Sequence, residues 1–263
     1  MKEFFGWGGY SREPEGFLSW QHLTFVTLLM VLMVTLAFLC GKKTRNKSDQ
    51  SKNRVLMVAA VLIDSLELFK IVLMCFRGQD PWGWLYELPL FLCSLQLIAL
   101  PLAAFSKGRI KQAALDFVLI FGVLGAVLGT YGAGQNYGCY PVLGFDNMVS
   151  GVTHSIAGFS ALYIGFSGLI SLQKRNMPIT FVILFAFSAC ATVANRLLDY
   201  NYMFLVRGDG TPYDLLFNLV DGNPILYPIG VVLLFVLYIL AFYGTYYLIQ
   251  ASRVKHSRKL CAL

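Results

Sequence analysis

Charged residues are scarce in this chain. Asp, Glu, Lys and Arg make up 13% of its 263 residues, hydrophobic residues make up 57%, and the mean hydropathy is +0.63. A soluble domain carries roughly 25% charged residues and about 45–50% apolar residues. The composition therefore excludes a soluble protein and predicts an integral membrane protein.

The sequence also lacks the features of several functional classes. The one cysteine and one histidine singled out below, Cys93 and His154, leave too few soft ligands for a metal site unless carboxylates complete the set. The net charge of +7 is divided among loops, and no nucleotide or nucleic-acid motif is present. The last hydrophobic block contains no lysine, which argues against a retinal-type pigment. We therefore expect no metal, no cofactor and no nucleic-acid partner.

Hydrophobic blocks of about 20 residues, the length that crosses ~30 Å of hydrocarbon, recur along the chain. They cover residues 22–40, 55–76, 84–105, 112–131, 149–172, 178–198 and 224–249. The predicted fold is all-α: one polytopic membrane domain over residues 1–263 with seven transmembrane helices.

Basic residues are concentrated in alternate connections. Fifteen of the 21 follow the first, third, fifth and seventh blocks, and four lie on the other side. The positive-inside rule then places the N-terminus outside and the C-terminus in the cytoplasm. We expect residues 1–21 to form an outer segment, 41–54 a basic cytoplasmic loop near anionic lipid, and 250–263 a basic cytoplasmic tail. The bare tails favour a bacterial cytoplasmic membrane.

The stretch ELPLFLCSLQLIALP, residues 87–101, is apolar enough to cross a bilayer but carries Glu87, Cys93 and Gln96. A plain membrane anchor needs none of these side chains. Pro89 donates no backbone N–H and crowds the preceding turn, so it predicts a helix kinked just before Cys93, and Pro101 repeats the effect. Broken helices in membranes line cavities. Cys93 is therefore a candidate reactive thiol.

The second block contains three ionisable residues, Asp64, Glu67 and Lys70, at three-residue spacing. This spacing keeps them on one broad helix face. Such groups are costly within a bilayer unless they are paired or face a polar interior, so the face points into the bundle. The sequence leaves open whether Glu67 and Lys70 only lock the helices together or support the function directly.

His154 is the only histidine within a span and lies on a face of small residues that packs against other helices. Helix geometry places Cys93 ~13 Å and His154 ~8 Å from the outer face. Glu87, Asn195 and Arg196 fall near the same depth. A histidine base activates a thiol, and an amide or guanidinium stabilises an oxyanion or holds a phosphate. The pattern predicts a Cys–His dyad.

Three stretches, ELPLFLCSLQ, THSIAGFSALYIGF and LDYNYMFL to NPILYP, resemble the YwaF-like or transmembrane protein 164 family, across most of the chain. This resemblance implies an integral membrane acyltransferase, distantly similar to the androgen-induced-gene hydrolases, that moves acyl chains between phospholipids. It implies catalytic roles for Cys93 and His154 and includes Asn201 and Tyr202 in a signature. Phe91 and Ser94 stand where the family motif often has histidine and aspartate.

These observations leave three hypotheses. The first is a phospholipid acyltransferase or transacylase, or with water as acceptor a lipase, that forms an acyl thioester. Its partners are membrane phospholipids or lysophospholipids, and its substrate-binding groups are Glu87, Gln96, Asn195, Arg196, Asn201 and Tyr202. The second is a transport or small-ligand binding protein that uses Asp64, Glu67, Lys70, Glu87 and His154 without covalent chemistry. The third is an assembly subunit without chemistry.

Overall fold

The computed structural model describes residues 1–169 and 172–260, with side chains up to Ser252. Its helices are α1 (Trp20–Thr44), α2 (Asp49–Gly78), η1 (Gly83–Glu87), α3 (Gln96–Phe105), α4 (Gly108–Tyr131), α5 (Gly134–Cys139), α6 (Phe145–Ser167), η2 (Lys174–Asn176), α7 (Met177–Leu198), η3 (Tyr202–Phe204), α8 (Tyr213–Leu219) and α9 (Leu226–Leu260). The described residues contain no strand, so the all-α prediction is confirmed. Residues 170–171 of the predicted fifth span and 261–263 of the predicted tail lie outside the described residues.

Five helices in the described part of the chain, α1, α4, α6, α7 and α9, are long and apolar enough to cross a membrane. The protein is therefore an integral membrane protein. Helix α2 has 30 residues but includes Asp64, Glu67 and Lys70 in its apolar part. The prediction of one kinked helix over residues 84–105 is wrong, because this segment consists of η1, an irregular stretch and the 10-residue helix α3.

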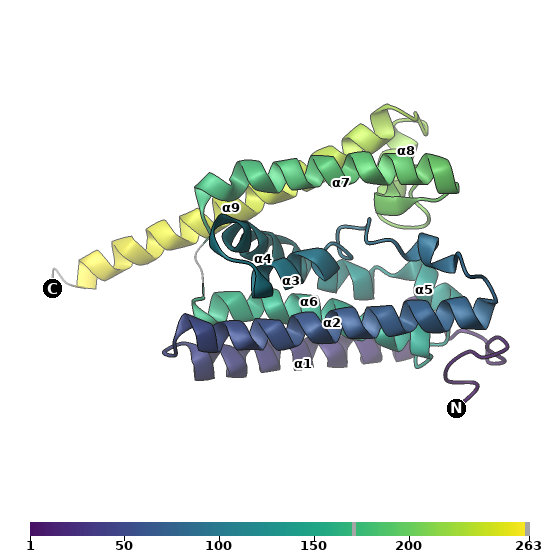
Figure 1. Ribbon diagram of the computed structural model, residues 1–263. Coiled ribbons are helices and arrows are strands. Elements are labelled where there is room, and N and C mark those ends of the chain that lie inside the picture. The colour runs from purple at the N-terminus through teal and green to yellow at the C-terminus, as the bar shows by residue number, and fades with distance from the viewer. Residues whose placement is uncertain (170–171, 261–263) are drawn as a thin grey trace.

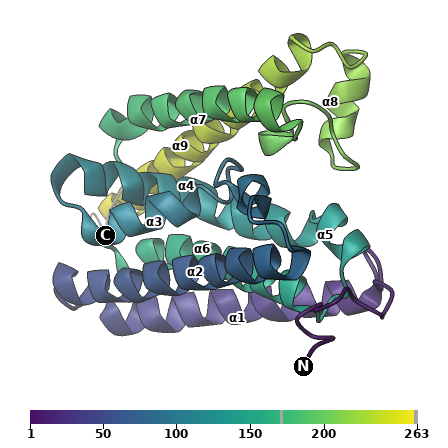
Figure 2. The same ribbon diagram turned by 45° about the vertical axis from the view of Figure 1, so that its right-hand side comes forward.

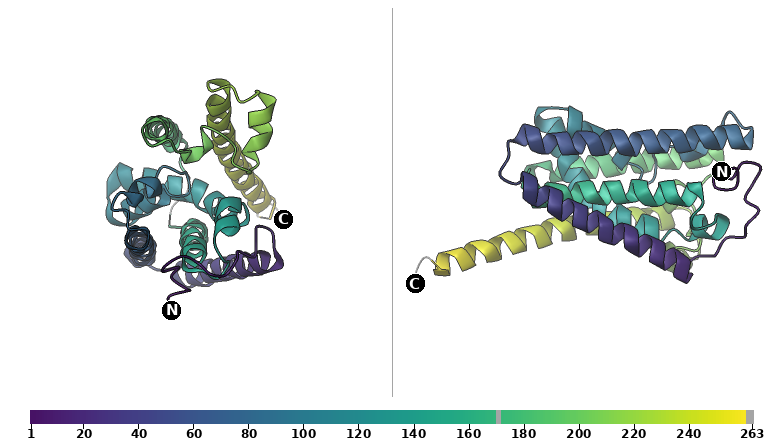
Figure 3. Two further views of the ribbon diagram at one scale, coloured as in Figure 1. Left: turned by 90° about the vertical axis from the view of Figure 1, so that its right-hand side faces the viewer. Right: turned by 90° about the horizontal axis from the view of Figure 1, so that it is seen from below.

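The helices form three tiers (Figure 1). Helices α1, α2 and α6 make one tier, α3 and α4 lie on it, and α7 and α9 make the third, an arrangement that is also visible after rotation (Figure 2). Viewed end-on, α6 lies among α1, α2 and α4, whereas α7 and α9 stand on the far side (Figure 3). The first two tiers are the main bundle, and we call α7, α8 and α9 the C-terminal limb.

Small residues bring α4 and α6 close together. A Cβ at Gly122 would lie 2.7 Å from the Ala157 carbonyl oxygen and 2.7 Å from the Ala161 Cβ, and a Cβ at Gly158 would lie 2.7 Å from the Ala126 Cβ. Such separations are too short for real side-chain contacts. Close backbone approach is how helices associate where lipid removes the hydrophobic driving force.

At the end of the bundle that carries the clustered basic residues, here the basic end, the connections are short. The predicted loop 41–54 is mostly helical: α1 continues to Thr44, α2 begins at Asp49, and only residues 45–48 connect them. Likewise α9 continues through most of the predicted tail, to Leu260. The predictions of an irregular loop and an irregular tail are wrong because both polar stretches continue helices whose apolar parts are already packed.

A hydrogen-bonded clamp holds α3 at the basic end. The Asn53 side-chain amide donates to the Ala104 carbonyl at 2.7 Å, and the Lys111 Nζ donates to Asn53 Oδ1 at 2.5 Å and to the Ala103 carbonyl at 2.8 Å. These bonds satisfy carbonyls that the last turn of a helix leaves free. They join α2, α3 and α4 at one point.

Residues 1–19 fold over the opposite end of the bundle. The Arg77 guanidinium makes two bonds to the Asp146 carboxylate, at 2.8 and 2.9 Å, and donates to the Phe5 carbonyl at 2.9 Å. The Tyr10 hydroxyl donates to Asp146 Oδ2 at 2.6 Å. Burial and the neighbouring Asp146 carboxylate raise the pKa of Tyr10 to about 12. This N-terminal segment is therefore an ordered cap.

Tyrosine hydroxyls attach the C-terminal limb to the rest of the protein. Tyr238 donates to the Ile120 carbonyl of α4 at 2.6 Å, and Tyr247 donates to the Leu172 carbonyl at 2.7 Å. The hydroxyl of Tyr202 donates to the Leu85 carbonyl of η1. Tyrosine suits such positions because its ring is apolar and its hydroxyl bonds a carbonyl.

Candidate active site

Cys93 lies in the irregular segment between η1 and α3. Leu88 is extended, with φ −57° and ψ 143°, as a residue before proline prefers. Because Pro89 also donates no N–H, the helix cannot continue through this point. Hydrogen bonds resume at Leu95 N to the Phe91 carbonyl, 3.0 Å, and Gln96 N to the Cys93 carbonyl, 3.2 Å. The thiol therefore precedes the first turn of α3 instead of lying within a kinked helix.

The position before α3 favours a thiolate. The positive end of a helix dipole and its free N–H groups stabilise an anion there. The backbone N–H of Ser94, the next residue, has no backbone acceptor in the described part of the chain and is free to face an anion. Ser94 is therefore the polar residue directly next to the thiol.

His154 projects from the middle of α6 with one ring nitrogen fixed. Its Nδ1 lies 2.7 Å from the Ser150 carbonyl oxygen, which only accepts, so Nδ1 carries the proton of the neutral ring. The Ser150 hydroxyl is 3.5 Å from the same nitrogen and accepts from the Asn136 amide of α5 at 3.4 Å. The neutral imidazole therefore presents a basic Nε2.

The thiol and the imidazole lie together against α4. Gly125 faces Cys93: a Cβ added to this glycine would lie 3.3 Å from the Cys93 Cβ. Gly129, one turn later, faces the Cδ2–Nε2 edge of His154 so closely that an added Cβ would overlap the ring. The Cys93 and His154 side chains therefore meet the same helix one turn apart. Both side chains lie deep in the bundle, yet both are only half-buried. A reacting group therefore has a route to them.

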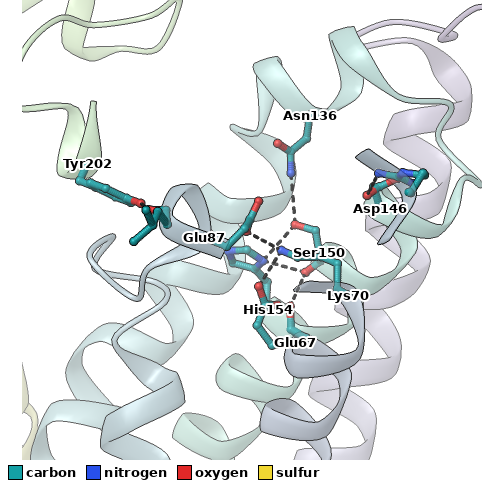
Figure 4. Close-up of polar contacts among 11 residues, drawn as sticks. Glu67, Lys70, Glu87, Asn136, Asp146, Ser150, His154 and Tyr202 are labelled. Atoms are coloured by element: carbon teal, nitrogen blue, oxygen red, sulfur yellow. Dashed lines mark hydrogen bonds and ion pairs between the residues drawn. The ribbon is translucent and has the colours of Figure 1, made fainter. Parts of the chain in front are cut away.

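An ion cluster lies next to His154 (Figure 4). The Lys70 ammonium is 2.6 Å from Glu67 Oε1 and 3.0 Å from Glu87 Oε2, and the three side chains are 14%, 13% and 29% exposed. The sequence predicted the Glu67–Lys70 pair but not the third member. Two carboxylates and one ammonium leave a net negative charge beside the imidazole. This charge favours the protonated ring that forms when the thiol is deprotonated.

Two polar side chains near the thiol have no partner in the described part of the chain. Gln96 is 0% exposed, and neither its Nε2 nor its Oε1 makes a hydrogen bond. Asp64 Oδ1 is also buried without a partner. The Asn53 amide of α2 bonds the Ala104 carbonyl of α3, and the two helices run antiparallel. Asp64 follows Asn53 by as many residues as Cys93 precedes Ala104, so Asp64 and Cys93 lie at about the same level. An unpaired buried amide costs about 1–3 kcal/mol, which a bound polar ligand would recover.

The structure does not bring Asn195, Arg196 and Asn201 to the thiol. Asn195 bonds the Tyr202 backbone in both directions, at 2.6 and 3.1 Å. Asn201 donates to Asp209 Oδ2 at 2.7 Å and to the Arg207 carbonyl at 2.8 Å. These asparagines therefore fold the connection after α7.

Arg196, the neighbour of Asn195, is exposed on the outside of α7. Adjacent residues on a helix point about 100° apart, so Arg196 faces away from the buried side of α7 on which Asn195 lies. Tyr202 is fully buried and packs edge-on against Phe91 at 5.4 Å, two residues before Cys93. It supports the segment that carries the thiol.

Sequence reasoning missed several neighbours of the pair: Gly125, Gly129, Asn136 and Ser150. For the two glycines the available signal was the helical period of α4, which places them on one face. Among the described residues, no group of three or more His, Cys, Asp and Glu is placed to hold a metal ion.

Comparison with known proteins gives one match. The sequence profile of the TMEM164 family matches residues 17–249, which include every helix from α1 to α8 and most of α9. No curated protein and no solved structure matches the chain significantly. The match covers both halves of the site described above.

Proposed function

This chain belongs to the TMEM164 family, and we propose that it is an intramembrane phospholipid acyltransferase with Cys93 as nucleophile and His154 as general base. The observation that supports this most is that a thiol before a helix N-terminus and an imidazole whose Nδ1 lies 2.7 Å from a carbonyl oxygen meet glycines one turn apart on α4. Similarity to the YwaF-like proteins and the androgen-induced-gene hydrolases is part of this proposal.

In the first half-reaction, His154 Nε2 takes the proton of the Cys93 thiol. The thiolate attacks the ester carbonyl carbon of a donor phospholipid and gives a tetrahedral oxyanion. When the oxyanion collapses, the C–O ester bond breaks, a thioester remains on Cys93, and the leaving lysophospholipid oxygen takes the proton from the imidazolium.

In the second half-reaction, the hydroxyl of an acceptor lysophospholipid gives its proton to His154 and attacks the thioester carbonyl. The C–S bond breaks, the thiolate leaves, and the imidazolium returns a proton to it. Water in place of the acceptor makes the same cycle a hydrolysis.

Gln96 is the proposed donor to the ester oxygen. It starts α3 three residues after Cys93, on the same side of the turn, and its buried amide has no protein partner. Together with the free Ser94 N–H it supplies two donors for this oxygen. Loss of one such donor typically costs about 10²–10³ in rate.

The decisive experiment traps the thioester. Purified protein is incubated with a phospholipid that carries a labelled acyl chain, and hydroxylamine-sensitive label on Cys93 is measured by peptide mass spectrometry. We expect labelled wild type, no label on Cys93→Ala, and label slowed by about 10² or more in His154→Gln. Cys190→Ala, an exposed thiol on α7, is the matched control and should label normally. An unlabelled wild type, or equal label on Cys93→Ala, would overturn the proposal.

A second candidate, transport or binding of a small solute or protons, is favoured by one observation: the unpaired Asp64 carboxylate lies on α2, the helix that supplies Glu67 and Lys70 to the ion cluster. Carboxylates that carry ions are expected to matter more than the thiol. A liposome uptake assay of the variants Glu67→Gln and Cys93→Ala separates the two functions. A carrier should lose uptake in Glu67→Gln and retain uptake in Cys93→Ala.

We further propose that the basic end faces the cytoplasm, in a bacterial cytoplasmic membrane, and that the N-terminal cap faces outward. Cys139 of α5 is exposed at the capped end, and Cys40 lies near the basic end. A membrane-impermeant thiol reagent added to intact cells should label Cys139 and spare Cys40. The reverse pattern would invert the orientation.

A further inference from the structure

A groove lies between the main bundle and the C-terminal limb, away from the ion cluster. It has a volume of about 470 Å³ and is lined by α3, α4 and α7, with Leu95, Ala113 and Phe117 at its base and Ile98, Ile183 and Phe187 along its sides. Arg109 is its one charged lining residue. The groove is therefore apolar along its length and cationic at one end.

The length of the groove matches one leaflet of a bilayer. Its α7 side runs from Ile179 to Phe187 and its α4 side from Arg109 to Phe117, in each case ~12 Å at 1.5 Å per residue. Half of the ~30 Å hydrocarbon layer is ~15 Å. The groove thus accommodates one extended lipid chain from the leaflet at the basic end.

Two arginines flank the cationic end. Arg109 is exposed, and no carboxylate forms an ion pair with it in the described part of the chain. Arg175, one turn before the groove residue Ile179, donates to Gln112 Oε1 at 2.6 Å, and Gln112 follows Arg109 by one turn on α4. The nearest acid, Asp116, is fully buried and bonded inward to the Asn176 amide at 2.7 Å.

We infer that this groove binds an anionic phospholipid of the leaflet at the basic end, with one acyl chain between α3, α4 and α7 and the phosphate between Arg109 and Arg175. Guanidinium groups bind phosphate through paired charge-assisted hydrogen bonds. An apolar groove that ends at the Arg109 guanidinium, with Arg175 beside it, complements both parts of such a lipid. This binding requires no acyl transfer.

The test measures lipid-dependent thermal stability of the full chain in neutral detergent. Phosphatidylglycerol and phosphatidylcholine of identical chains are titrated against wild type, Arg109→Gln/Arg175→Gln and the control Lys42→Gln/Lys43→Gln. The control removes two exposed charges at the same end, on α1. We expect the wild type to bind phosphatidylglycerol about tenfold or more tightly than phosphatidylcholine, the arginine variant to lose this preference, and the lysine variant to keep it.

A third variant tests the chain-binding part. Ala113→Phe fills the base of the groove and should remove the stabilisation by both lipids. If it does not fold, Ile110→Trp covers the groove from a position that is 62% exposed. Equal affinity of the wild type for the two lipids, equal loss in the arginine and lysine variants, or full binding by the filled groove would overturn the inference. So would an equal shift with glycerol phosphate alone, because the site would then bind only the anion.

Discussion

The main bundle and the C-terminal limb are built differently. In the most apolar part of α4, 61% of residues are buried, and in α6 56%, against 28% in both α7 and α9, and 22% in α1 at the edge of the bundle. Glycine and alanine bring α4 and α6 together, whereas tyrosine hydroxyls connect α9 to the bundle. The bundle holds the thiol and the imidazole, and the limb leaves a groove that lipid can fill. Close packing thus positions the candidate chemistry, and looser packing gives access to the bilayer.

The largest expected effect is on the free energy of unfolding, and it compares one ion pair in each region. Lys70→Met leaves Glu67 and Glu87 buried without a counter-ion and should lower the free energy of unfolding by about 3–5 kcal/mol. Arg207→Ala removes a pair whose arginine is 56% exposed, after α7, and should cost about 0–1 kcal/mol. Denaturant titration in detergent measures both. Similar values for the two variants would remove the proposed difference between the regions.

The second prediction tests the glycine contact that positions the histidine. Gly129→Ala places a methyl group against the His154 ring and should destabilise the protein by about 1–3 kcal/mol and abolish acylation of Cys93. Gly165→Ala, on α6 with open space around it, should stabilise by about 0.5–1 kcal/mol and leave acylation unchanged. Thermal unfolding and the thioester assay report on the two variants. Normal acylation of Gly129→Ala would show that the ring is not held there.

The third prediction concerns the pH response of the limb. Burial opposes ionisation of Asp209, but the Asn201 amide and the Arg207 guanidinium outweigh it and hold the pKa of Asp209 below its ordinary value. A lowered pKa means that this stabilisation is present above the pKa of the unfolded chain and is lost as the pH falls through the folded value. Amide exchange in residues 200–211, corrected for intrinsic rates, should therefore rise in acid.

Asp209→Asn is the matching variant for that measurement. It should exchange faster than wild type at neutral pH and show little further change in acid. Asp221→Asn, exposed in the next connection, serves as the control and should keep the wild-type response. If wild type and Asp209→Asn respond alike, Asp209 does not hold this connection.

The smallest effect is expected for Arg196→Gln. The side chain is exposed on α7 and is not near the thiol, so acylation of Cys93 should stay within about twofold of wild type. Asn195→Ala, the adjacent change, breaks both bonds to the Tyr202 backbone and should slow acylation by loosening the support of Phe91. A large loss in Arg196→Gln would restore it as a headgroup ligand.

The sequence predicted the helical fold because long apolar blocks have few alternatives in a bilayer. It also predicted similar depths for Cys93 and His154 by counting along helices, although the chain between Glu87 and Gln96 is not helical. Spacing likewise placed Glu67 and Lys70 on one face. These predictions depend on periodicity, which is local information.

The remaining features depend on contacts between distant segments. Pro89 indicates an interrupted helix, but the sequence does not decide whether the helix bends or ends there. That depends on which distant side chains bond the backbone carbonyls that the interruption leaves free, as the Tyr202 hydroxyl bonds the Leu85 carbonyl. Asn195 and Arg196 were indistinguishable in sequence and differ only in the direction that each faces. The order of residues 1–19 comes from Asp146 and Arg77, whose positions no local pattern reveals.

The segment that carries Cys93 is fixed at both ends. The Lys70–Glu87 pair holds it before the thiol, and the Asn53–Lys111 clamp holds the far end of α3. Both contacts join this segment to α2, so the thiol is held between two fixed points of the main bundle. Under the proposed mechanism, these two points set the height in the membrane at which a lipid ester meets the sulfur.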